Sequence, residues 1–277
     1  MNMKNTDTSV LICAKNSEKI IENSLVKIKN NQPKEIVVID GCSTDKTIEI
    51  AKKFTDKIFS DDGKGLGYAR KLGISKINTK LLVIVSPDDE ISEGFIKNAS
   101  EELLNSSKNT VALLSPKRLK NLKTFFDRGQ NEIFRLSEKF KIRTVGNPSI
   151  YKTEFLKKYD FDSKFSANED TDICERWYKD NLRTDWGKTF KTFEIESRNW
   201  SEFKSRFIWY GEGDAVFCKK WIKLDKLTAL RHFFHPLYTY GLKYPFFFFL
   251  KFKLNYCIYS IMCCHFRYVG FIKKFIN

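Results

Sequence analysis

Short apolar segments alternate with amphipathic segments throughout residues 9–92, and this alternation constrains the fold more than any other feature of the chain. The apolar segments are nearly continuous and rich in β-branched residues, as is typical of parallel strands covered on both faces. We predict strands at residues 9–14, 34–40, 57–60 and 81–85. We predict helices at residues 17–30, 43–54 and 66–76, and a further helix capped by Ser92. This order indicates an α/β fold with a mostly parallel, doubly wound sheet.

Acidic residues follow two of the predicted strands. Asp40 ends the second strand, and Asp88, Asp89 and Glu90 come shortly after the fourth. In sheets of this kind, ligands bind beyond the carboxyl ends of the strands. An Asp at such an end can accept a hydrogen bond from a base N–H, and consecutive carboxylates suit an Mg²⁺ or Mn²⁺ ion that also holds a diphosphate. An acidic turn that caps the next helix is the alternative interpretation of residues 88–90.

A glycine-rich turn at residues 61–67 precedes the predicted helix that carries Arg70. Flexible backbone, a helix N-terminus and nearby cations suit a phosphate group, but the glycine pattern taken alone favours a plain turn. The glycine spacing does not match the fingerprint of dinucleotide-binding proteins.

A second acidic segment, Asn168-Glu169-Asp170, opens a predicted helix that runs to about residue 181. The N-terminus of a helix stabilises carboxylates, so we expect Asp170 to be ionised and able to accept a proton. Asp172 and Arg176 stand four residues apart, which predicts an ion pair on the helix surface.

The C-terminal part of the chain is basic and aromatic. The whole chain has a formal net charge of +15, which favours anionic partners. Residues 226–277 contain no Asp or Glu, and the run Phe246–Phe249 lies among Lys243, Lys251 and Lys253. This pattern suits a segment that lies on an anionic membrane surface, although extra helices packed on the core are the alternative. We place a domain boundary at residue 200, with an N-terminal domain at 1–200 and a C-terminal helical, membrane-associating segment at 201–277.

The cysteines and histidines favour a reducing compartment and exclude some kinds of metal site. The 7 cysteines form no Cys-x-x-Cys pair, which indicates reduced thiols and a cytoplasmic protein. With only 3 histidines, any metal is expected on carboxylates. We find neither a secretory signal nor an apolar segment of the about 20 residues that a membrane span needs. The predicted location is therefore cytoplasmic, and peripheral on the inner face of the membrane.

Taken in order, these segments resemble family 2 glycosyltransferases over residues 7–215. Residues 38–47, Val-Ile-Asp-Gly-Cys-Ser-Thr-Asp-Lys-Thr, are similar to the nucleotide-binding element of that family. Residues 65–73 are similar to its Gly-x-x-x-Ala-Arg-Asn-x-Gly element, and residues 169–176 to its Glu-Asp-x-Asp-x-x-x-Arg catalytic element. The resemblance implies the GT-A fold and transfer of a sugar, with inversion, from a nucleotide donor that we expect to be a UDP-sugar.

The resemblance also implies roles for individual residues. Asp170 would be the general base, with Glu169 beside it, and Asp88 or Asp89 would hold the metal. Ser86 stands where the first Asp of the family's Asp-x-Asp is usual, which leaves the choice between Asp88 and Asp89 open. The donor-binding residues would be Asp40, Arg70, Ala14, Asn16 and Lys64. Residues 209–215, Trp-Tyr-Gly-Glu-Gly-Asp-Ala, resemble a stretch that follows the catalytic element in relatives, and they receive no role from the sequence.

The predicted function is metal-dependent, inverting transfer of a sugar from a nucleotide-diphosphate donor to a hydroxyl of a glycan or lipid-linked acceptor. The process would be the synthesis of surface polysaccharide or glycoconjugate. A sugar-nucleotide nucleotidyltransferase is one alternative, but the first predicted strand is not followed by the glycine-rich basic loop that it needs. A non-enzymatic basic protein that binds nucleic acid or a membrane is another, but no helix-turn-helix, zinc-finger or RNP-like segment is present. We therefore expect no nucleic-acid partner.

Overall fold

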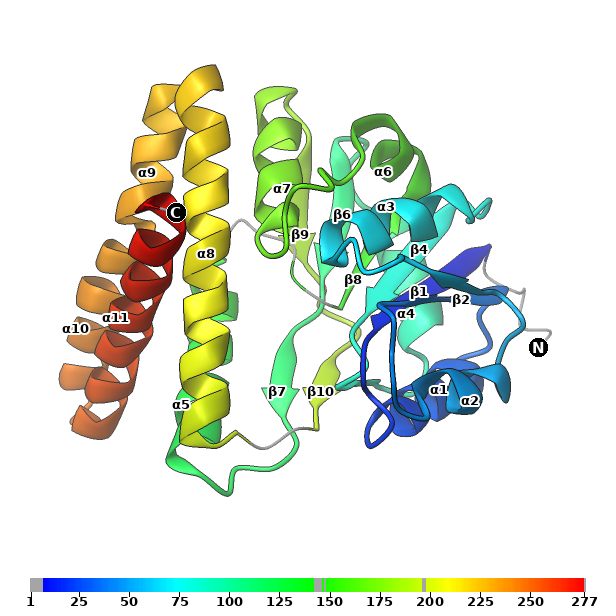
Figure 1. The fold of residues 1–277 in the computed structure, drawn as a ribbon, viewed down its shortest axis with the longest axis horizontal. Helices are drawn as coiled ribbons and strands as arrows, with labels where there is room; N and C mark the ends of the chain where they lie inside the picture. The colour runs from blue at the N-terminus through cyan, green and yellow to red at the C-terminus, as the bar shows by residue number, and fades with distance from the viewer. Residues whose placement is uncertain (1–6, 142–145, 147, 196–197, 277) are drawn as a thin grey trace. The chain divides into compact units, whose positions relative to one another are not determined.

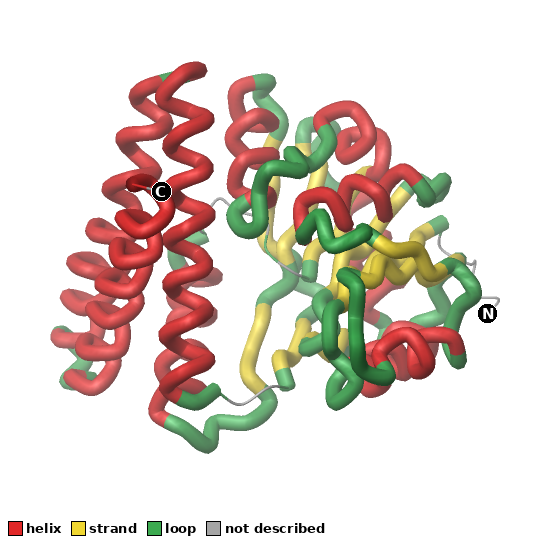
Figure 2. Tube along the Cα trace, in the orientation of Figure 1, coloured by secondary structure: helices red, strands yellow, loops and turns green. Residues whose placement is uncertain are grey.

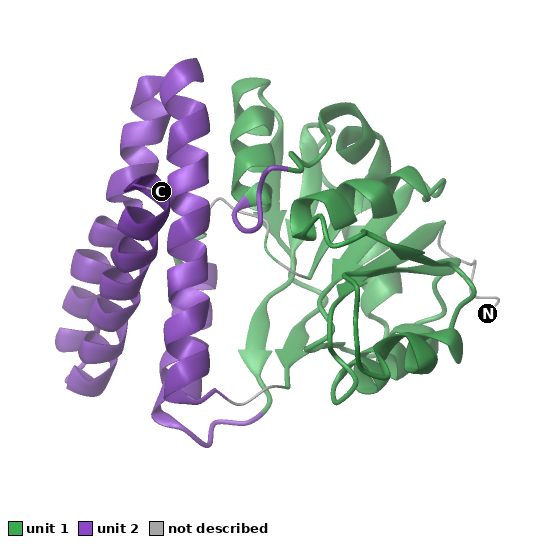
Figure 3. Cartoon of the chain, in the orientation of Figure 1, with its two compact units in different colours: residues 1–120, 140–163, 169–196 green, residues 121–139, 164–168, 197–277 purple. Residues whose placement is uncertain are grey.

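The computed structural model describes residues 7–141, 146, 148–195 and 198–276, which form two compact units (Figure 3). The α/β unit comprises Met1–Lys120, Phe140–Ser163 and Glu169–Glu196. The helical unit comprises Asn121–Lys139, Lys164–Asn168 and Ser197–Asn277. The helical unit thus takes in residues 121–139, 164–168 and 197–200, all of which precede residue 201.

A seven-stranded sheet forms the centre of the α/β unit, with strand order β3-β2-β1-β4-β8-β6-β9 (Figure 1). Only β8 runs antiparallel to its neighbours, so the predicted mostly parallel sheet is confirmed. The strands are β1 (Thr8–Ala14), β2 (Glu35–Asp40), β3 (Ile58–Ser60), β4 (Leu81–Val85), β6 (Thr110–Leu114), β8 (Ser149–Lys152) and β9 (Arg183–Trp186).

Helices cover both faces of this sheet, because the side chains of each strand alternate between two apolar clusters. In β1, Val10 and Ile12 pack with α1, α2 and α4, whereas Leu11 packs with α3, α6 and α7. The helices are α1 (Ile21–Asn30), α2 (Thr47–Lys52), α3 (Leu66–Ser75), α4 (Phe95–Leu104), α6 (Thr153–Tyr159) and α7 (Glu169–Lys179). The doubly wound arrangement expected from the sequence is therefore present.

A second sheet of the α/β unit, with strand order β5-β10-β7, is not predicted from the sequence. Its strands are β5 (Asp89–Ile91), β7 (Lys117–Leu119) and β10 (Thr192–Glu194). The helix after β5 also begins later than expected. The N-cap of α4 is Gly94, in a left-handed conformation with φ 69°, so the prediction that Ser92 caps this helix is wrong.

The helical unit consists of helices and loops, with no strand among its described residues (Figure 2). Its elements are α5 (Phe125–Lys139), α8 (Trp200–Leu224), α9 (Lys226–Pro236), the π-helix η1 (Leu237–Lys243), α10 (Tyr244–Phe249) and α11 (Leu254–Ile276). The long helices α8 and α11 approach closely at two glycines. A Cβ atom on Gly211 would lie 1.9 Å from the Arg267 carbonyl oxygen, and one on Gly270 would lie 2.0 Å from that of Ile208. In the described part of the chain, no helix is both long enough and apolar enough to cross a bilayer.

Candidate functional site

Asp40 lies at the carboxyl end of β2, beside the end of β1. The register pairs Asp40 with Ala14, and β4 pairs with the other side of β1, so the ends of these three strands lie at one edge of the sheet. Asp40 is 4% exposed, and the Ser43 amide donates a hydrogen bond to its Oδ2 (3.0 Å). Its Oδ1 is buried and has no hydrogen-bond partner among the described residues. Because a buried carboxylate oxygen normally has a donor, this atom is suited to a ligand N–H.

A cavity of about 470 Å³ adjoins Asp40 at the β2–β3 edge. Ile58, Phe59 and Ser60 of β3 contribute to its lining, together with residues of α2. The lining combines the apolar side chains of Ile48, Ile58 and Phe59 with the charged ones of Asp40, Lys52 and Asp56, a mixture that suits a small polar ligand.

The predicted donor residues Ala14 and Asn16 lie on the adjoining loop. The Ala14 carbonyl accepts a hydrogen bond from the Gly41 amide (2.8 Å), and Asn16 Oδ1 accepts one from the Thr44 amide (2.9 Å). The Asn16 amide donates in turn to Ser43 Oγ (2.9 Å). Both residues therefore join the β1 and β2 loops and hold the backbone around Asp40.

The glycine-rich turn leads directly into α3. Gly63 and Gly65 have φ values of 72° and 92°, which glycine adopts without strain, and Gly65 is the N-cap of α3. Lys64 is exposed between them, with its Nζ 4.6 Å from the centre of the Tyr68 ring. An exposed ammonium beside a helix N-terminus remains suited to a phosphate, as the sequence predicts.

Arg70 of α3 forms a buried ion pair with Glu169, the first residue of α7. Arg70 is 4% exposed, and its guanidinium also lies 5.5 Å from the centre of the Phe161 ring. The Arg70 Nε is buried and has no hydrogen-bond partner within the ranges that the structure describes. The ion pair ties the guanidinium to the acidic segment that begins α7, and the predicted contact between Arg70 and the donor stays a prediction.

Asp170 follows Glu169 and is half-buried. Its Oδ1 accepts a hydrogen bond from the Thr171 amide (2.7 Å). Burial and the neighbouring Glu169 carboxylate raise the pKa of Asp170 to about 7, against the lowering effect of Arg70. The expected stabilisation of the ionised form by the helix N-terminus is thus opposed by burial and by the adjacent carboxylate. A carboxyl group with a pKa near neutrality is well suited to proton transfer.

The predicted pair between Asp172 and Arg176 is present, with 3.0 Å between Arg176 Nε and Asp172 Oδ2. It does not lie on the helix surface, because Asp172 is fully buried. Arg176 also donates to the Tyr159 and Asp160 carbonyls at the end of α6. This pair is therefore structural, as the sequence indicates, but it connects α7 to α6.

The three acids after β4 differ in their surroundings. Asp89 is 0% exposed and its Oδ1 lies 2.7 Å from the Lys117 ammonium, with Glu194 at 3.5 Å from the same nitrogen. Burial raises the pKa of Asp89 against the lowering effect of Lys117. Glu90 is bound by Lys120 through both carboxylate oxygens (3.1 and 2.9 Å). Asp88 is half-buried at the end of the loop that follows β4.

These surroundings bear on which of the acids could hold a cation. In the described ranges, no three His, Cys, Asp or Glu side chains are grouped so as to hold a metal ion. A cation coordinated mainly by diphosphate oxygens needs few protein ligands, and carboxylate oxygens are of the type that Mg²⁺ and Mn²⁺ prefer. Asp88 carries a half-buried carboxylate of this type, and Asp89 lies 2.7 Å from the Lys117 ammonium, so the choice between the two as metal ligand stays a prediction.

Residues 9–163 match the family model described as glycosyl transferase family 2, which covers more than half of the chain. The chain therefore belongs to the glycosyl transferase family 2. The predicted family is confirmed.

Two characterised relatives show similarity to parts of the chain. The poly(ribitol-phosphate) beta-N-acetylglucosaminyltransferase TarS of Staphylococcus aureus is 28% identical over 177 residues, which are 58% of this chain and 30% of TarS. The cholesterol galactosyltransferase of Borreliella burgdorferi is 32% identical over 97 residues, which are 32% of this chain and 27% of that protein. The chain thus spans less than a third of the length of either relative.

Solved structures establish the fold. TarS residues 1–349 in complex with UDP-GlcNAc align with 97% of this chain and 89% of that one, with a TM-score of 0.57 and 18% identity. The mannosyltransferase PcManGT from Pyrobaculum calidifontis, in complex with GDP-Man and Mn²⁺, aligns with 98% and 88% of the two chains, with a TM-score of 0.67 and 14% identity. At these identities the likeness concerns the fold alone, and it confirms the predicted GT-A fold.

Sequence reasoning missed the charged partners of the predicted acids. Lys117 and Glu194 lie on three-residue strands, which are too short to show an alternating pattern. Asp214 is a buried acid on α8, within the segment 209–215 that the sequence left without a role. The small residues Gly211, Gly213 and Ala215 around it are the one sequence signal of close packing at this point.

Proposed function

We propose that this chain is an inverting glycosyltransferase that moves a sugar from a nucleotide-diphosphate donor, with UDP-sugars favoured, to an acceptor hydroxyl. The observation that carries the proposal is the unpartnered Oδ1 of Asp40, at the sheet edge where β1, β2 and β4 end. Membership of the glycosyl transferase family 2 supports the same chemistry.

The donor base would lie beside Asp40, and its N–H group would donate to the unpartnered Oδ1. The diphosphate would extend towards the glycine-rich turn, where Lys64 is exposed. A phosphate at the N-terminus of α3 would meet backbone N–H groups and the positive end of the helix dipole. Asn16 and Ala14 would keep the loop beside the base in place through their contacts with the β2 loop.

Asp170 would act as the general base. The acceptor oxygen attacks the anomeric carbon from the side opposite the diphosphate, Asp170 takes the hydroxyl proton, and the nucleotide diphosphate departs with the electrons of the broken bond. A single displacement of this kind inverts the anomeric configuration. Glu169 is paired with Arg70 and would orient the start of α7 rather than accept the proton.

A divalent cation would be held by Asp88 together with diphosphate oxygens. When bound, an Mg²⁺ or Mn²⁺ ion would supply Lewis-acid stabilisation of the negative charge on the departing diphosphate. Asp89 and its partner Lys117 would keep the loop that carries Asp88 in place.

A nucleotide and sugar-nucleotide screen tests the proposal. The melting temperature of the protein should rise with UDP and Mn²⁺, and the protein should slowly hydrolyse at least one of UDP-glucose, UDP-galactose, UDP-N-acetylglucosamine and GDP-mannose. An absence of both effects across the panel would contradict the proposed function.

Replacing Asp40 by Asn should weaken UDP binding by about 10- to 100-fold, because a hydrogen bond to a charged group contributes about 1.5–3 kcal/mol. The Ser43 amide requires an acceptor, so the new amide would direct its NH₂ group towards the base and meet another donor. Isothermal titration of UDP measures the effect. Glu49→Gln, which removes an exposed charge from nearby α2, is the matched control and should bind UDP normally. Equal affinities for both variants would exclude Asp40 from the donor site.

The acceptor is proposed to be a glycan or lipid-linked sugar used in surface polysaccharide or glycoconjugate synthesis, reached from an anionic membrane surface. The turn between α10 and α11 carries the features of such a contact. Phe252 is 93% exposed, with Phe249, Leu250 and Leu254 also exposed around it. Lys251 and Lys253 flank Phe252, so apolar side chains and cations occur together, as in proteins that bind anionic lipid surfaces.

The double variant Phe249→Ser/Phe252→Ser should bind anionic liposomes at least about 10-fold more weakly, because burial of one large apolar side chain contributes about 1.5–3 kcal/mol. Sedimentation with phosphatidylserine-containing liposomes measures the change. Leu104→Ser/Leu122→Ser removes two exposed apolar side chains elsewhere and should leave binding unchanged. If both double variants sediment like the wild type, the exposed turn does not bind the membrane.

A further inference from the structure

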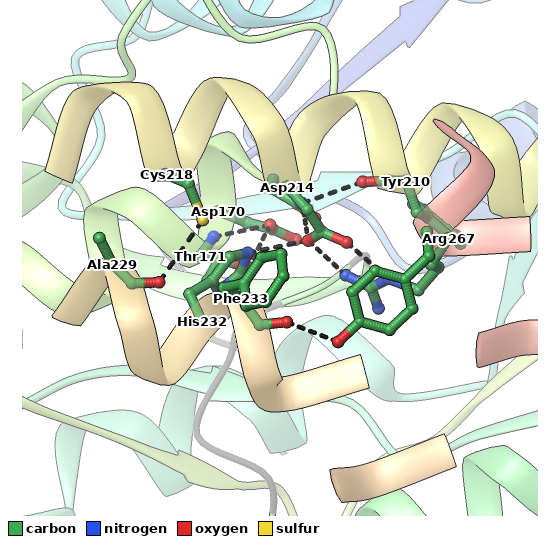
Figure 4. A network of polar contacts seen from close by, with 11 residues as sticks. Asp170, Thr171, Tyr210, Asp214, Cys218, Ala229, His232, Phe233 and Arg267 are labelled. Atoms are coloured by element: carbon green, nitrogen blue, oxygen red, sulfur yellow. Dashed lines mark hydrogen bonds and ion pairs between the residues drawn. The ribbon is translucent and has the colours of Figure 1, made fainter. Parts of the chain in front are cut away.

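Asp214 of α8 lies at the centre of a buried polar network in the helical unit (Figure 4). Arg267 of α11 binds it through two hydrogen bonds, from Nε to Oδ2 (2.8 Å) and from Nη2 to Oδ1 (2.6 Å). His232 of α9 lies with its Nε2 2.8 Å from Oδ1. Asp214 is 2% exposed. Although burial alone would raise the pKa of this carboxyl, Arg267 and His232 hold it well below its usual range, so Asp214 is ionised.

A third partner of Asp214 comes from outside these helices. The Asn168 side-chain amide donates to Asp214 Oδ1 (2.7 Å) and to the Tyr210 carbonyl (3.3 Å). Asn168 has a φ of 64°, in the left-handed region, which asparagine adopts more readily than most residues other than glycine. The two hydrogen bonds to α8 stabilise this conformation.

Gly213 of α8 allows Ala167, the residue before Asn168, to lie close to the same helix. A Cβ atom on Gly213 would lie 2.8 Å from both the Cβ and the carbonyl oxygen of Ala167. Phe165 packs in a cluster with Phe217 and Trp221 one to two turns further along α8. One side of α8 therefore holds residues 165–168 by apolar packing, by close backbone contact and by hydrogen bonds.

The chain continues from Asn168 through one peptide bond into Glu169 and then Asp170, where α7 begins. We propose that Asp214 is a positioning residue for the general base: by fixing Asn168 in its left-handed conformation, it sets the direction in which the chain enters α7 and hence the placement of Asp170. This inference rests on the proposed function of Asp170. It gives segment 209–215 a role, since Tyr210, Gly213 and Asp214 all contact residues 167–168.

The variant Asn168→Gly separates positioning from general stability. Glycine adopts the left-handed backbone freely, and the change removes the amide while leaving Arg267 and His232 on Asp214. We expect kcat for the sugar nucleotide that the wild type hydrolyses fastest in the panel, with Mn²⁺, to fall about 10- to 100-fold, because misplacement by about 1 Å can cost that much. The KM for that donor should stay unchanged. Gly213→Ala, which displaces Ala167 and alters no charge, should give the same split between kcat and KM.

His232→Phe is the matched control. It removes another partner of Asp214 but keeps a ring that can stack on Phe217, whose centre lies 3.9 Å from that of His232. The melting temperature should fall while kcat stays near the wild-type value. If the network only stabilises the helices, Asn168→Gly and His232→Phe will both lower the melting temperature and neither will change kcat. That result, or an increase of the donor KM in Asn168→Gly, overturns the proposal.

Asp170→Asn in the same assay distinguishes a failure of the proposed general base from a failure of the positioning role alone. If Asp170→Asn hydrolyses the donor like the wild type, the proposed general base is wrong and the positioning role fails with it. If Asp170→Asn is inactive and Asn168→Gly is as fast as the wild type, only the positioning role fails.

Discussion

Asp170→Asn should reduce sugar transfer by about 10²–10⁴-fold while UDP affinity stays near that of the wild type. The amide preserves the shape of the side chain and cannot accept the acceptor proton. Asp170 lies on α7, and the residues proposed to bind the base and the diphosphate lie on the β1 and β2 loops and before α3. Isothermal titration of UDP and nucleotide release from the sugar nucleotide measure the two quantities separately.

The pH dependence of the wild type provides a second measurement of the same residue. The pKa of Asp170 is raised to about 7, and the base must be deprotonated to act. The rate should therefore be full above this pKa and should fall as the pH decreases through it. In Asp170→Asn the rate should be low at every pH, and the decrease at acidic pH should be absent.

Two outcomes would contradict the assignment. A loss of UDP binding in Asp170→Asn would move this residue into the donor site. A product with retained anomeric configuration would exclude the single displacement altogether, whatever the rate of the variant.

Asp88→Asn should abolish the Mn²⁺ dependence of UDP binding and reduce turnover by at least about 100-fold, corresponding to ~3 kcal/mol of lost charge stabilisation. The reason is that Asp88 offers a half-buried carboxylate, of the type that Mn²⁺ prefers, at the end of the loop after β4. Titration of UDP with and without Mn²⁺ measures the dependence. Binding that remains Mn²⁺-dependent in the variant would exclude Asp88 as the ligand.

Asp89→Asn is the matched comparison, with the same chemical change at the adjacent position. It should mainly reduce stability, by about 3 kcal/mol, because the Lys117 ammonium loses the carboxylate that lies 2.7 Å from it. Urea unfolding measures this loss. A stable Asp89→Asn protein that no longer responds to Mn²⁺ would reverse the assignment of the two residues.

The first strands of the large sheet could be predicted because their apolar runs are continuous, whereas the sequence analysis predicts no strand at β6, β8 or β9. The strands β1, β2 and β4 lie within one residue of their predicted positions, and the acids at their ends follow from that. The start of α7 could also be predicted from a local pattern, because Glu169, Asp170 and Asp172 all lie in the first turn of the helix.

Contacts between distant residues could not be predicted. Arg70 and Glu169 are 99 positions apart, and nothing in either local sequence indicates that they pair. The raised pKa of Asp170 depends on burial, which the helix N-terminus alone does not reveal. Ser92 has the chemistry of a cap, but the left-handed Gly94 begins α4 because the chain leaves β5 by a tight turn.

The small sheet β5-β10-β7 has a further consequence for donor recognition. It begins at Asp89, and the Ile195 amide, just beyond β10, donates to the Asp88 carbonyl (3.0 Å). The main chain of Asp88 is thus hydrogen-bonded to a residue more than a hundred positions later in the sequence, next to the end of β10. Since this hydrogen bond restrains the backbone at Asp88, the proposed capture of a nucleotide diphosphate there would require little loss of backbone entropy, and affinity would depend on charge and coordination rather than on loop closure.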